Sequence, residues 1–154
     1  MIAAVVFLAT RPHEDRDRQP LIDAIEATFA RGGTVIVTDY KDSPSLGEQT
    51  RTSELTTSPG TDPDALQDDR SIVRAVRDAV DVESLGSETL QGIPTTHYVA
   101  TVDNELPDSI KDRPSQLDAW IDASGLLRRY KLEDWLRPAT GEPLDSYLAL
   151  DFQY

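Results

Sequence analysis

The feature that most constrains the fold of this chain is the alternation of apolar and polar residues through its second half. In residues 144–154, the even positions hold leucines, Phe152 and Tyr154, and only Ser146 interrupts this apolar set. Successive side chains of a β-strand point to opposite faces, so the pattern predicts a strand with one buried and one solvated face. Similar strands are predicted at residues 82–90, 95–102, 117–122 and 126–134. This antiparallel meander must cover its apolar face with helices or use it as a groove for an apolar ligand.

Two helices are predicted ahead of the meander. Residues 20–31 carry an apolar stripe at helical spacing, with Pro20 at the start and two glycines just after the end. The second helix is predicted from Asp62, a plausible N-cap, to about residue 80. The apolar positions of the two helices are Leu21, Ile22, Ile25 and Phe29, then Leu66, Ile72, Val73, Val76 and Val80.

The segments between and after these helices complete the predicted fold. Residues 34–40 are rich in β-branched side chains and predict a strand, and residues 47–55 predict a more polar one. Residues 56–62 and 106–116 are predicted as loops because they are polar and contain proline. We therefore predict an α+β fold, in which one curved antiparallel β-sheet, a half-barrel, carries two helices packed on its concave face.

The N-terminal part of the chain divides into an apolar segment, residues 1–10, and a polar linker that ends at residue 19. A bilayer span needs about 20 apolar residues, and a signal peptide needs a basic stretch before its apolar core. The segment has neither property, which leaves a buried strand or the end of a clipped signal or membrane anchor. We slightly favour the clipped anchor, and expect a single domain over residues 20–154.

Composition excludes several classes of function. The formal net charge of −13 argues against binding to nucleic acids and to anionic lipid headgroups, which both need clustered lysine and arginine. The chain has no cysteine, which excludes disulfides, thiol catalysis and cysteine-ligated metal sites. No glycine-rich phosphate loop occurs, and we expect no cofactor.

Candidate catalytic and metal-binding residues are few. His97 lies in a predicted strand and His13 in the polar linker, and no nucleophile motif accompanies either. We therefore predict that His97 is a structural strand residue and that neither catalytic nor metal-binding residues are present. The paired carboxylates lack the spacing of a calcium loop, which favours a solvated acidic surface. These pairs are Asp15 with Asp17, Asp62 with Asp64, Asp68 with Asp69, and Glu133 with Asp134.

Aromatic residues are spread over several predicted strands and allow two interpretations. Such rings can line an apolar ligand cleft on an open sheet. They can also be cross-strand packing partners or core residues, and we favour packing. The residues concerned are Tyr98, Trp120, Tyr130, Trp135 and Tyr147.

Two runs of sequence carry a resemblance to a known family. The first is Gly-Ile-Pro-Thr-Thr-His-Tyr-Val-Ala-Thr-Val-Asp at residues 92–103. The second is Leu-Asp-Ala-Trp-Ile-Asp-Ala-Ser-Gly-Leu-Leu-Arg-Arg-Tyr at residues 117–130. They resemble the C-terminal half of actinobacterial cell-envelope lipoproteins of the LppX/LprG type, relatives of the LolA/LolB lipoprotein carriers. Residues 62–66 and 82–86 resemble the segments that precede these strands in the family. Residues 21–40 resemble the start of the family's sequences more loosely.

The resemblance implies a non-enzymatic, extracytoplasmic protein of the cell envelope that binds a lipid or another hydrophobic ligand. The site would be formed by the inner face of the sheet and the helices, so individual ligand-binding residues are not predicted. The chain departs from the family in lacking a lipobox cysteine and in having a shorter sheet after residue 40.

Two alternatives to lipid binding remain open at this stage. One is a membrane-anchored protein-interaction or sensor domain with the same fold but no ligand cavity. The other is a hydrolase that uses one of the acidic pairs.

Overall fold

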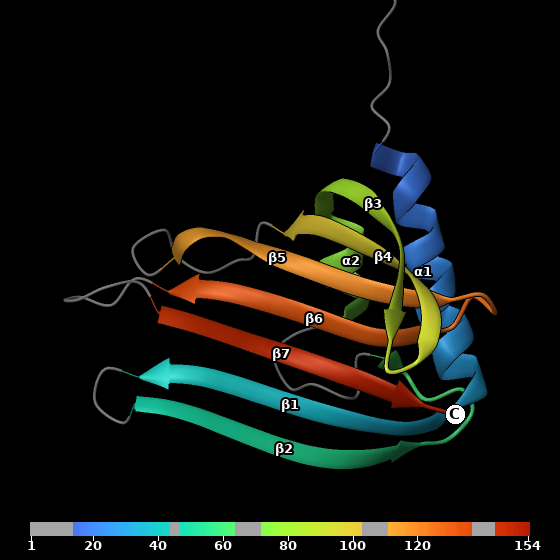
Figure 1. Cartoon of the computed structure of the whole chain (residues 1–154), viewed down its shortest axis with the longest axis horizontal. Helices are drawn as coiled ribbons and strands as arrows, with labels where there is room; N and C mark the ends of the chain where they lie inside the picture. Colours follow the sequence, from blue (N-terminus) through green and yellow to red (C-terminus); the bar gives the residue numbers. More distant parts are fainter. Residues whose placement is uncertain (1–13, 44–46, 64–71, 103–110, 137–143) are drawn as a thin grey trace, which may run out of the picture.

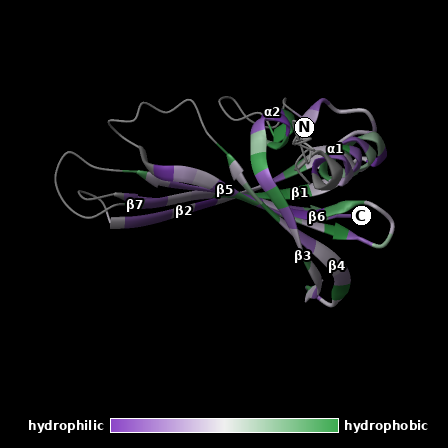
Figure 2. Ribbon diagram, turned by 90° about the horizontal axis from the view of Figure 1, so that it is seen from above, coloured by the Kyte–Doolittle hydropathy of each residue, from purple (hydrophilic) through white to green (hydrophobic). Residues whose placement is uncertain are grey.

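The computed structural model describes residues 14–43, 47–63, 72–102, 111–136 and 144–154, and within them the fold is α+β, as predicted. Seven antiparallel strands form one open sheet in the order β2-β1-β7-β6-β5-β4-β3. Both helices lie on the same, concave side of this twisted and curved sheet (Figures 1 and 2). The apolar segment 1–10 and His13 lie outside the described residues.

Helix α1 spans Glu14–Arg31 and therefore begins six positions before the predicted start at Pro20. Proline inside a helix removes one backbone hydrogen bond, but the glutamate, arginine and glutamine that precede Pro20 are good helix formers. Part of the predicted polar linker is thus the first turns of α1. The predicted apolar stripe is confirmed, because Leu21, Ile25 and Phe29 are buried.

Strands β1, Gly33–Ser43, and β2, Gly47–Thr57, form a hairpin that matches the two predicted N-terminal strands. β1 pairs on its other side with the last strand of the chain, β7. β2 is one edge of the sheet, and every residue in it except Thr57 is exposed.

Helix α2 spans Ile72–Asp78, shorter at its C-terminal end than predicted. Ile72 and Val76 are buried as expected, and Val73 is partly buried. The prediction for Val80 is wrong, because the chain enters β3, Ala79–Leu90, and Val80 pairs with Thr101 on the outer face of the sheet. Val80 is 41% exposed as a result. Leu66 lies outside the described residues.

The meander continues through β4, Ile93–Val102; β5, Lys111–Asp122; β6, Leu127–Leu136; and β7, Leu144–Gln153. β5 begins six residues earlier than the predicted strand, so the prediction of a loop up to residue 116 is wrong. Pro114 is accommodated because the pairing of β5 with β6 is irregular between Arg113 and Gln116, and prolines in sheets occur at such irregularities.

The core lies between the helices and the concave face of the sheet. The predicted apolar face of the last strand is confirmed, since Leu148, Leu150 and Phe152 are all buried. Phe152 packs edge-on against Phe29 of α1, with ring centroids 5.8 Å apart. α1 also packs against β3, β5, β6 and α2, while α2 packs against β4.

Candidate functional site

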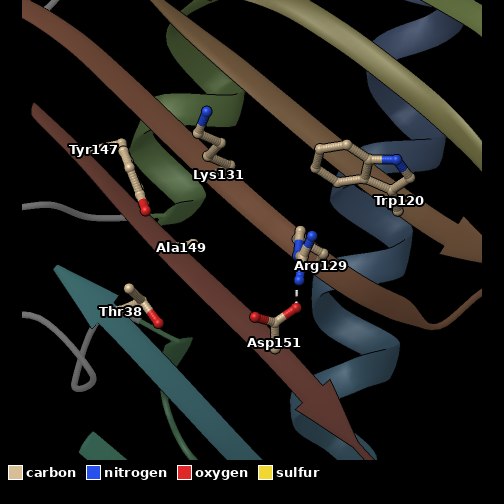
Figure 3. Close-up of a pocket in the computed structure, with 7 residues that line it drawn as sticks. All are labelled: Thr38, Trp120, Arg129, Lys131, Tyr147, Ala149 and Asp151. Atoms are coloured by element: carbon tan, nitrogen blue, oxygen red, sulfur yellow. Dashed lines mark hydrogen bonds and ion pairs between the residues drawn. The ribbon is translucent and has the colours of Figure 1, made fainter. Parts of the chain in front are cut away.

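The outer face of the sheet carries a shallow hollow of about 410 Å³ whose floor is Ala149. Figure 3 shows how this small side chain leaves a gap between larger neighbours on β1, β5, β6 and β7. The hollow exists because Ala149 stands in register with Lys131 and Thr38, in the middle of three adjacent strands. The remaining lining residues are Trp120, Arg129, Tyr147 and Asp151.

The charged and aromatic groups around this hollow already bind one another. Arg129 Nε donates to Asp151 across 2.6 Å, and Lys131 Nζ donates to Glu133 across 2.8 Å. The ring of Tyr147 stacks on Tyr40, with centroids 5.0 Å apart, and Lys131 lies 4.8 Å from its centre. Cross-strand pairs such as Arg129 with Asp151 and Tyr147 with Tyr40 stabilise a sheet, so the hollow is the gap within a packed outer layer.

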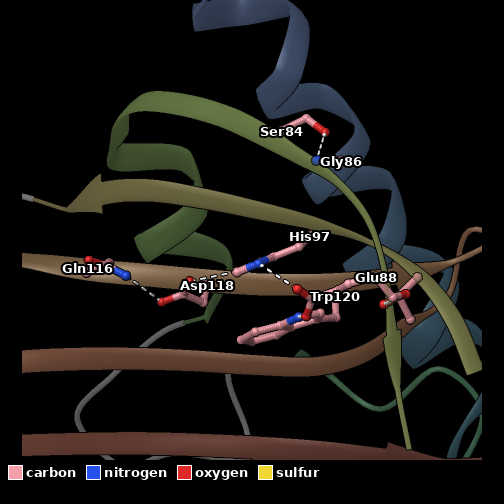
Figure 4. Close-up of polar contacts among 8 residues, drawn as sticks. Ser84, Gly86, Glu88, His97, Gln116, Asp118 and Trp120 are labelled. Carbon is pink, nitrogen blue, oxygen red and sulfur yellow. Dashed lines mark hydrogen bonds and ion pairs between the residues drawn. The ribbon is translucent and has the colours of Figure 1, made fainter. Parts of the chain in front are cut away.

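His97 stands at the centre of a second outer-face network, which Figure 4 shows. Its Nε2 lies 2.8 Å from Asp118 Oδ1, its Nδ1 lies 3.5 Å from Glu88 Oε2, and its ring stacks on Trp120 with centroids 4.3 Å apart. The Trp120 indole N–H donates to Glu88, and Gln116 donates to Asp118. These contacts tie β3, β4 and β5 together, and a purely structural role for His97 stays a prediction.

The other aromatic residues do not join these two networks into one cleft. Trp135 stacks with Arg113, whose guanidinium carbon lies 3.7 Å from the ring centre. Tyr130 is 1% exposed and belongs to the core, and Tyr98 is partly buried against it. The rings thus lie on both faces of the sheet, and the packing interpretation describes their contacts.

The acidic pair Glu133 and Asp134 is separated by the sheet itself. The two residues are neighbours in β6, so their side chains point to opposite faces. Glu133 binds Lys131 on the outer face, whereas Asp134 is 3% exposed on the concave face. They cannot share a proton or a cation. The side chains of the other pairs lie wholly or partly outside the described residues.

The concave face has two halves, and the described helices lie over only one of them. α1 crosses the strands where β6 begins and β7 ends, as the contacts from Thr28 to Leu127 and from Phe29 to Phe152 show. At the opposite ends of β6 and β7, neither described helix lies over the sheet (Figure 1). We call this region the distal patch. It consists of Leu132, Asp134 and Leu136 on β6, Leu144, Ser146 and Leu148 on β7, and Ser115 on β5.

The distal patch is an apolar stripe interrupted by one polar pair. Leu132 lies opposite Leu148 and Leu136 opposite Leu144, and between these leucine pairs Asp134 lies opposite Ser146. Ser115 donates a hydrogen bond to Asp134. The Ser146 hydroxyl is buried, and among the described residues it has no hydrogen-bond partner.

Sequence reasoning saw these polar residues without recognising their association. In the sequence, Ser146 interrupts an apolar face, Asp134 is half of an acidic pair, and Ser115 lies in a predicted loop. Their shared position depends on the registers of β5, β6 and β7, which no local pattern encodes.

The described ranges bear on two further classes of site, metal centres and membrane spans. No group of three or more histidine, aspartate or glutamate side chains in these ranges is arranged to hold a metal ion. Neither described helix combines the length and the apolar character needed to cross a bilayer.

Comparison with known proteins finds similarity in structure alone. No family model matches the sequence, and no curated protein matches it. One similar solved structure is the lipoprotein LppX of Mycobacterium tuberculosis, with 11% identity, a TM-score of 0.49, and coverage of 90% of this chain and 92% of LppX. Another is LprF from Mycobacterium bovis, with 13% identity, a TM-score of 0.47 and the same coverage. The family named by the sequence resemblance is thus also represented among the structural neighbours.

Proposed function

We propose that this chain is a non-catalytic module that binds a hydrophobic ligand against the distal patch of its concave face. The observation that supports the proposal is the leucine stripe of β6 and β7, which continues beyond the crossing of α1. Leu150 belongs to the core cluster that packs under the helices. Leu148 and its cross-strand partner Leu132 continue the stripe into the distal patch. An extracytoplasmic place at the cell envelope is part of this proposal and rests on the sequence resemblance.

Binding of this kind requires apolar area more than a constellation of reactive groups. Burial of apolar surface is favourable by about 25 cal/mol per Å² and is non-directional. An acyl chain at the end of the patch would contact the cross-strand pair Leu136 and Leu144, which are half-buried, whereas Leu132 and Leu148 are already buried behind them. The outer-face hollow offers a weaker site, because its cations and rings are already paired with one another.

The test is native mass spectrometry of protein expressed in a membrane-bearing host and purified without detergent, followed by solvent extraction and lipid analysis. The proposal predicts an adduct of lipid mass that disappears on extraction. A variant Leu144→Trp should reduce the adduct, because the half-buried Leu144 lies at the end of the patch, where an indole fills space. Asp145→Trp is the matched control, since the neighbouring Asp145 is exposed on the opposite face.

Two results would contradict hydrophobic-ligand binding at this patch. One is a clean protein mass that stays unchanged after incubation with mixed lipids. The other is an adduct that survives Leu144→Trp as well as it survives Asp145→Trp. Circular dichroism of both variants establishes that each is folded before the masses are compared.

A second candidate function is a protein-interaction domain, which the free edge at β2 favours. β2 pairs with β1 in unbroken register over its whole length and forms one end of the sheet. A regular edge strand offers backbone groups to an added strand. If β2 serves this purpose, Thr52→Lys and Ser53→Lys should abolish partner binding or self-association, measured by analytical ultracentrifugation, without changing any lipid adduct.

A further inference from the structure

The hollow of the outer face offers room for a small ligand. Its volume of about 410 Å³ lies within the range of about 300–1,000 Å³ that small-molecule sites occupy, and its floor is Ala149 (Figure 3). The helices lie on the opposite, concave face of the sheet. An inference drawn from this hollow therefore goes beyond the proposed function and does not depend on it.

Two aromatic rings flank the hollow, and each is held by a residue that does not line it. His97 stacks on Trp120 from the β4 side with ring centroids 4.3 Å apart, and Tyr40 stacks on Tyr147 from the β1 side at 5.0 Å. The second face of each ring is therefore turned toward β6, the strand between them. Rings that are fixed before a ligand arrives lose little rotamer freedom on binding.

The charged groups of the hollow keep part of their hydrogen-bonding capacity. Arg129 donates through Nε to Asp151 Oδ1 across 2.6 Å, and Lys131 donates one hydrogen bond to Glu133. Among the described residues, the terminal amino groups of Arg129, the second carboxylate oxygen of Asp151 and the Thr38 hydroxyl have no hydrogen-bond partner. Figure 3 shows Thr38 and Asp151 turned toward the same gap. Donors and acceptors thus surround one hollow.

We infer that this hollow binds a neutral sugar ring of a glycan. Adjacent hydroxyls of a pyranose both donate and accept, so one donates to the second oxygen of Asp151 while its neighbour accepts from an Arg129 amino group. Hydrogen bonds with one charged partner are roughly twice as strong as those between neutral groups. The C–H face of the sugar lies against the Trp120 face that His97 leaves uncovered, which buries apolar area.

Other classes of ligand fit this hollow less well. Its two cations are balanced by the carboxylates of Asp151 and Glu133, so an anion gains little net attraction in a chain of net charge −13. A cation would compete with Arg129 and Lys131 for the same carboxylates. An apolar chain would displace water from both ion pairs without replacing its hydrogen bonds. Sugar hydroxyls replace them, because they donate and accept as water does.

The experiment is a proton–nitrogen NMR titration of the full chain with the neutral trisaccharides maltotriose, cellotriose and mannotriose, and separately with sodium sulfate. We expect at least one trisaccharide to shift the indole N–H signal of Trp120 and the backbone signals of Arg129 and Ala149. The indole signal of Trp135, the second tryptophan of the chain, should stay in place because this residue does not line the hollow. Sulfate should leave all of these signals unchanged.

Three variants assign the binding to the hollow. Ala149→Leu should abolish the shifts by filling the floor, whereas Ala27→Leu, at an exposed position of α1, is the matched control and should bind as the parent protein does. Asp151→Asn should raise the dissociation constant about tenfold, the order of magnitude of one hydrogen bond to a charged group. Thr38→Val should raise it about threefold, as expected for a neutral hydrogen bond.

Melting temperatures establish that each variant is folded, and Thr38→Val and Asp151→Asn still test the site if Ala149→Leu does not fold. The inference is wrong if no trisaccharide at millimolar concentration shifts the signals of the hollow, or if folded Ala149→Leu binds as the parent protein does. Shifts with sulfate but not with the trisaccharides would make the hollow an anion site and refute the sugar assignment. Neither result bears on the hydrophobic ligand of the concave face, which the lipid adduct tests separately.

Discussion

The backbone N–H of Leu127 donates a hydrogen bond of 2.8 Å to the side-chain hydroxyl of Thr28, although the two residues are 99 positions apart in the chain. Thr28 lies on α1 and Leu127 is the first residue of β6, and both are almost fully buried. Next to them, the hydroxyl of Tyr154 donates to the carbonyl oxygen of Leu127 across 2.7 Å. A single residue of β6 thus fixes both the helix and the C-terminal residue.

We expect Thr28→Val to destabilise the fold by about 1–3 kcal/mol, because it leaves the buried Leu127 N–H without its acceptor at nearly constant volume. The free energy of unfolding from urea titration measures the effect. Thr38→Val on the outer face is the control and should change stability by less than about 0.5 kcal/mol. Equal losses in the two variants would show that the Thr28 hydrogen bond contributes nothing specific.

Alkaline pH should destabilise the protein through Tyr154. Burial raises the pKa of its phenol to about 12, while an unfolded tyrosine titrates near 10. The unfolded state therefore loses this proton first, and stability that is complete below pH 10 falls as the pH rises toward 12. Melting temperatures from pH 8 to 12 should show a shallower alkaline decline for Tyr154→Phe than for the parent protein. Identical slopes would refute the assignment.

Acidic pH should act through Asp122 in the turn between β5 and β6. Burial by itself raises the pKa of this carboxyl, but hydrogen bonds from the Leu126 N–H, the Arg128 side chain and the Ser124 N–H outweigh it and hold the pKa below 3.8. The carboxylate therefore stabilises the fold above about pH 4, and this contribution is lost as the pH falls through the lowered value.

Asp122→Asn should accordingly cost about 1–3 kcal/mol at pH 7, and less near pH 3, since one acceptor oxygen is lost and the charge is removed. Chemical denaturation at several pH values measures the difference. Asp145→Asn, at an exposed position on β7, serves as the control. A cost that does not decrease with acid would contradict the lowered pKa.

Two glycines with nearly the same φ angle should respond differently to alanine. Gly32 has φ of 73° and Gly47 has φ of 70°, so alanine is strained at both, by about 1–2 kcal/mol. A Cβ at Gly32 would lie 2.8 Å from the carbonyl oxygen of Thr57, whereas a Cβ at Gly47 would meet no atom within 4 Å.

Thermal denaturation should therefore rank Gly32→Ala well below Gly47→Ala in melting temperature. Backbone strain is shared by the two variants, so the difference reports the steric contact between the end of α1 and the end of β2. Equal melting temperatures would mean that the backbone at Thr57 shifts away from the added Cβ at no cost in stability.

The sequence predicted the fold well wherever a local pattern carried the information. Alternation placed Leu148, Leu150 and Phe152 on one face, and helical spacing placed Leu21, Ile25 and Phe29 on another, because burial follows directly from periodicity. Element ends were predicted less well. The sequence predicts a helix start at Pro20 and a loop around Pro114, but the helix formers before Pro20 extend α1, and the irregular pairing of β5 with β6 accommodates Pro114 within a longer strand.

The sequence by itself determined the α+β class, the meander and the residues of the apolar faces, because each follows from periods of two or 3.6 residues. It could not determine the registers of the strands, nor where the N-terminal hairpin of β1 and β2 joins the sheet. Only the tertiary structure decided that β1 pairs with β7, that His97 stacks on Trp120, and that Asp134 faces Ser146. These contacts join residues far apart in the chain, and a shift of register by one residue would move every one of them to the opposite face of the sheet.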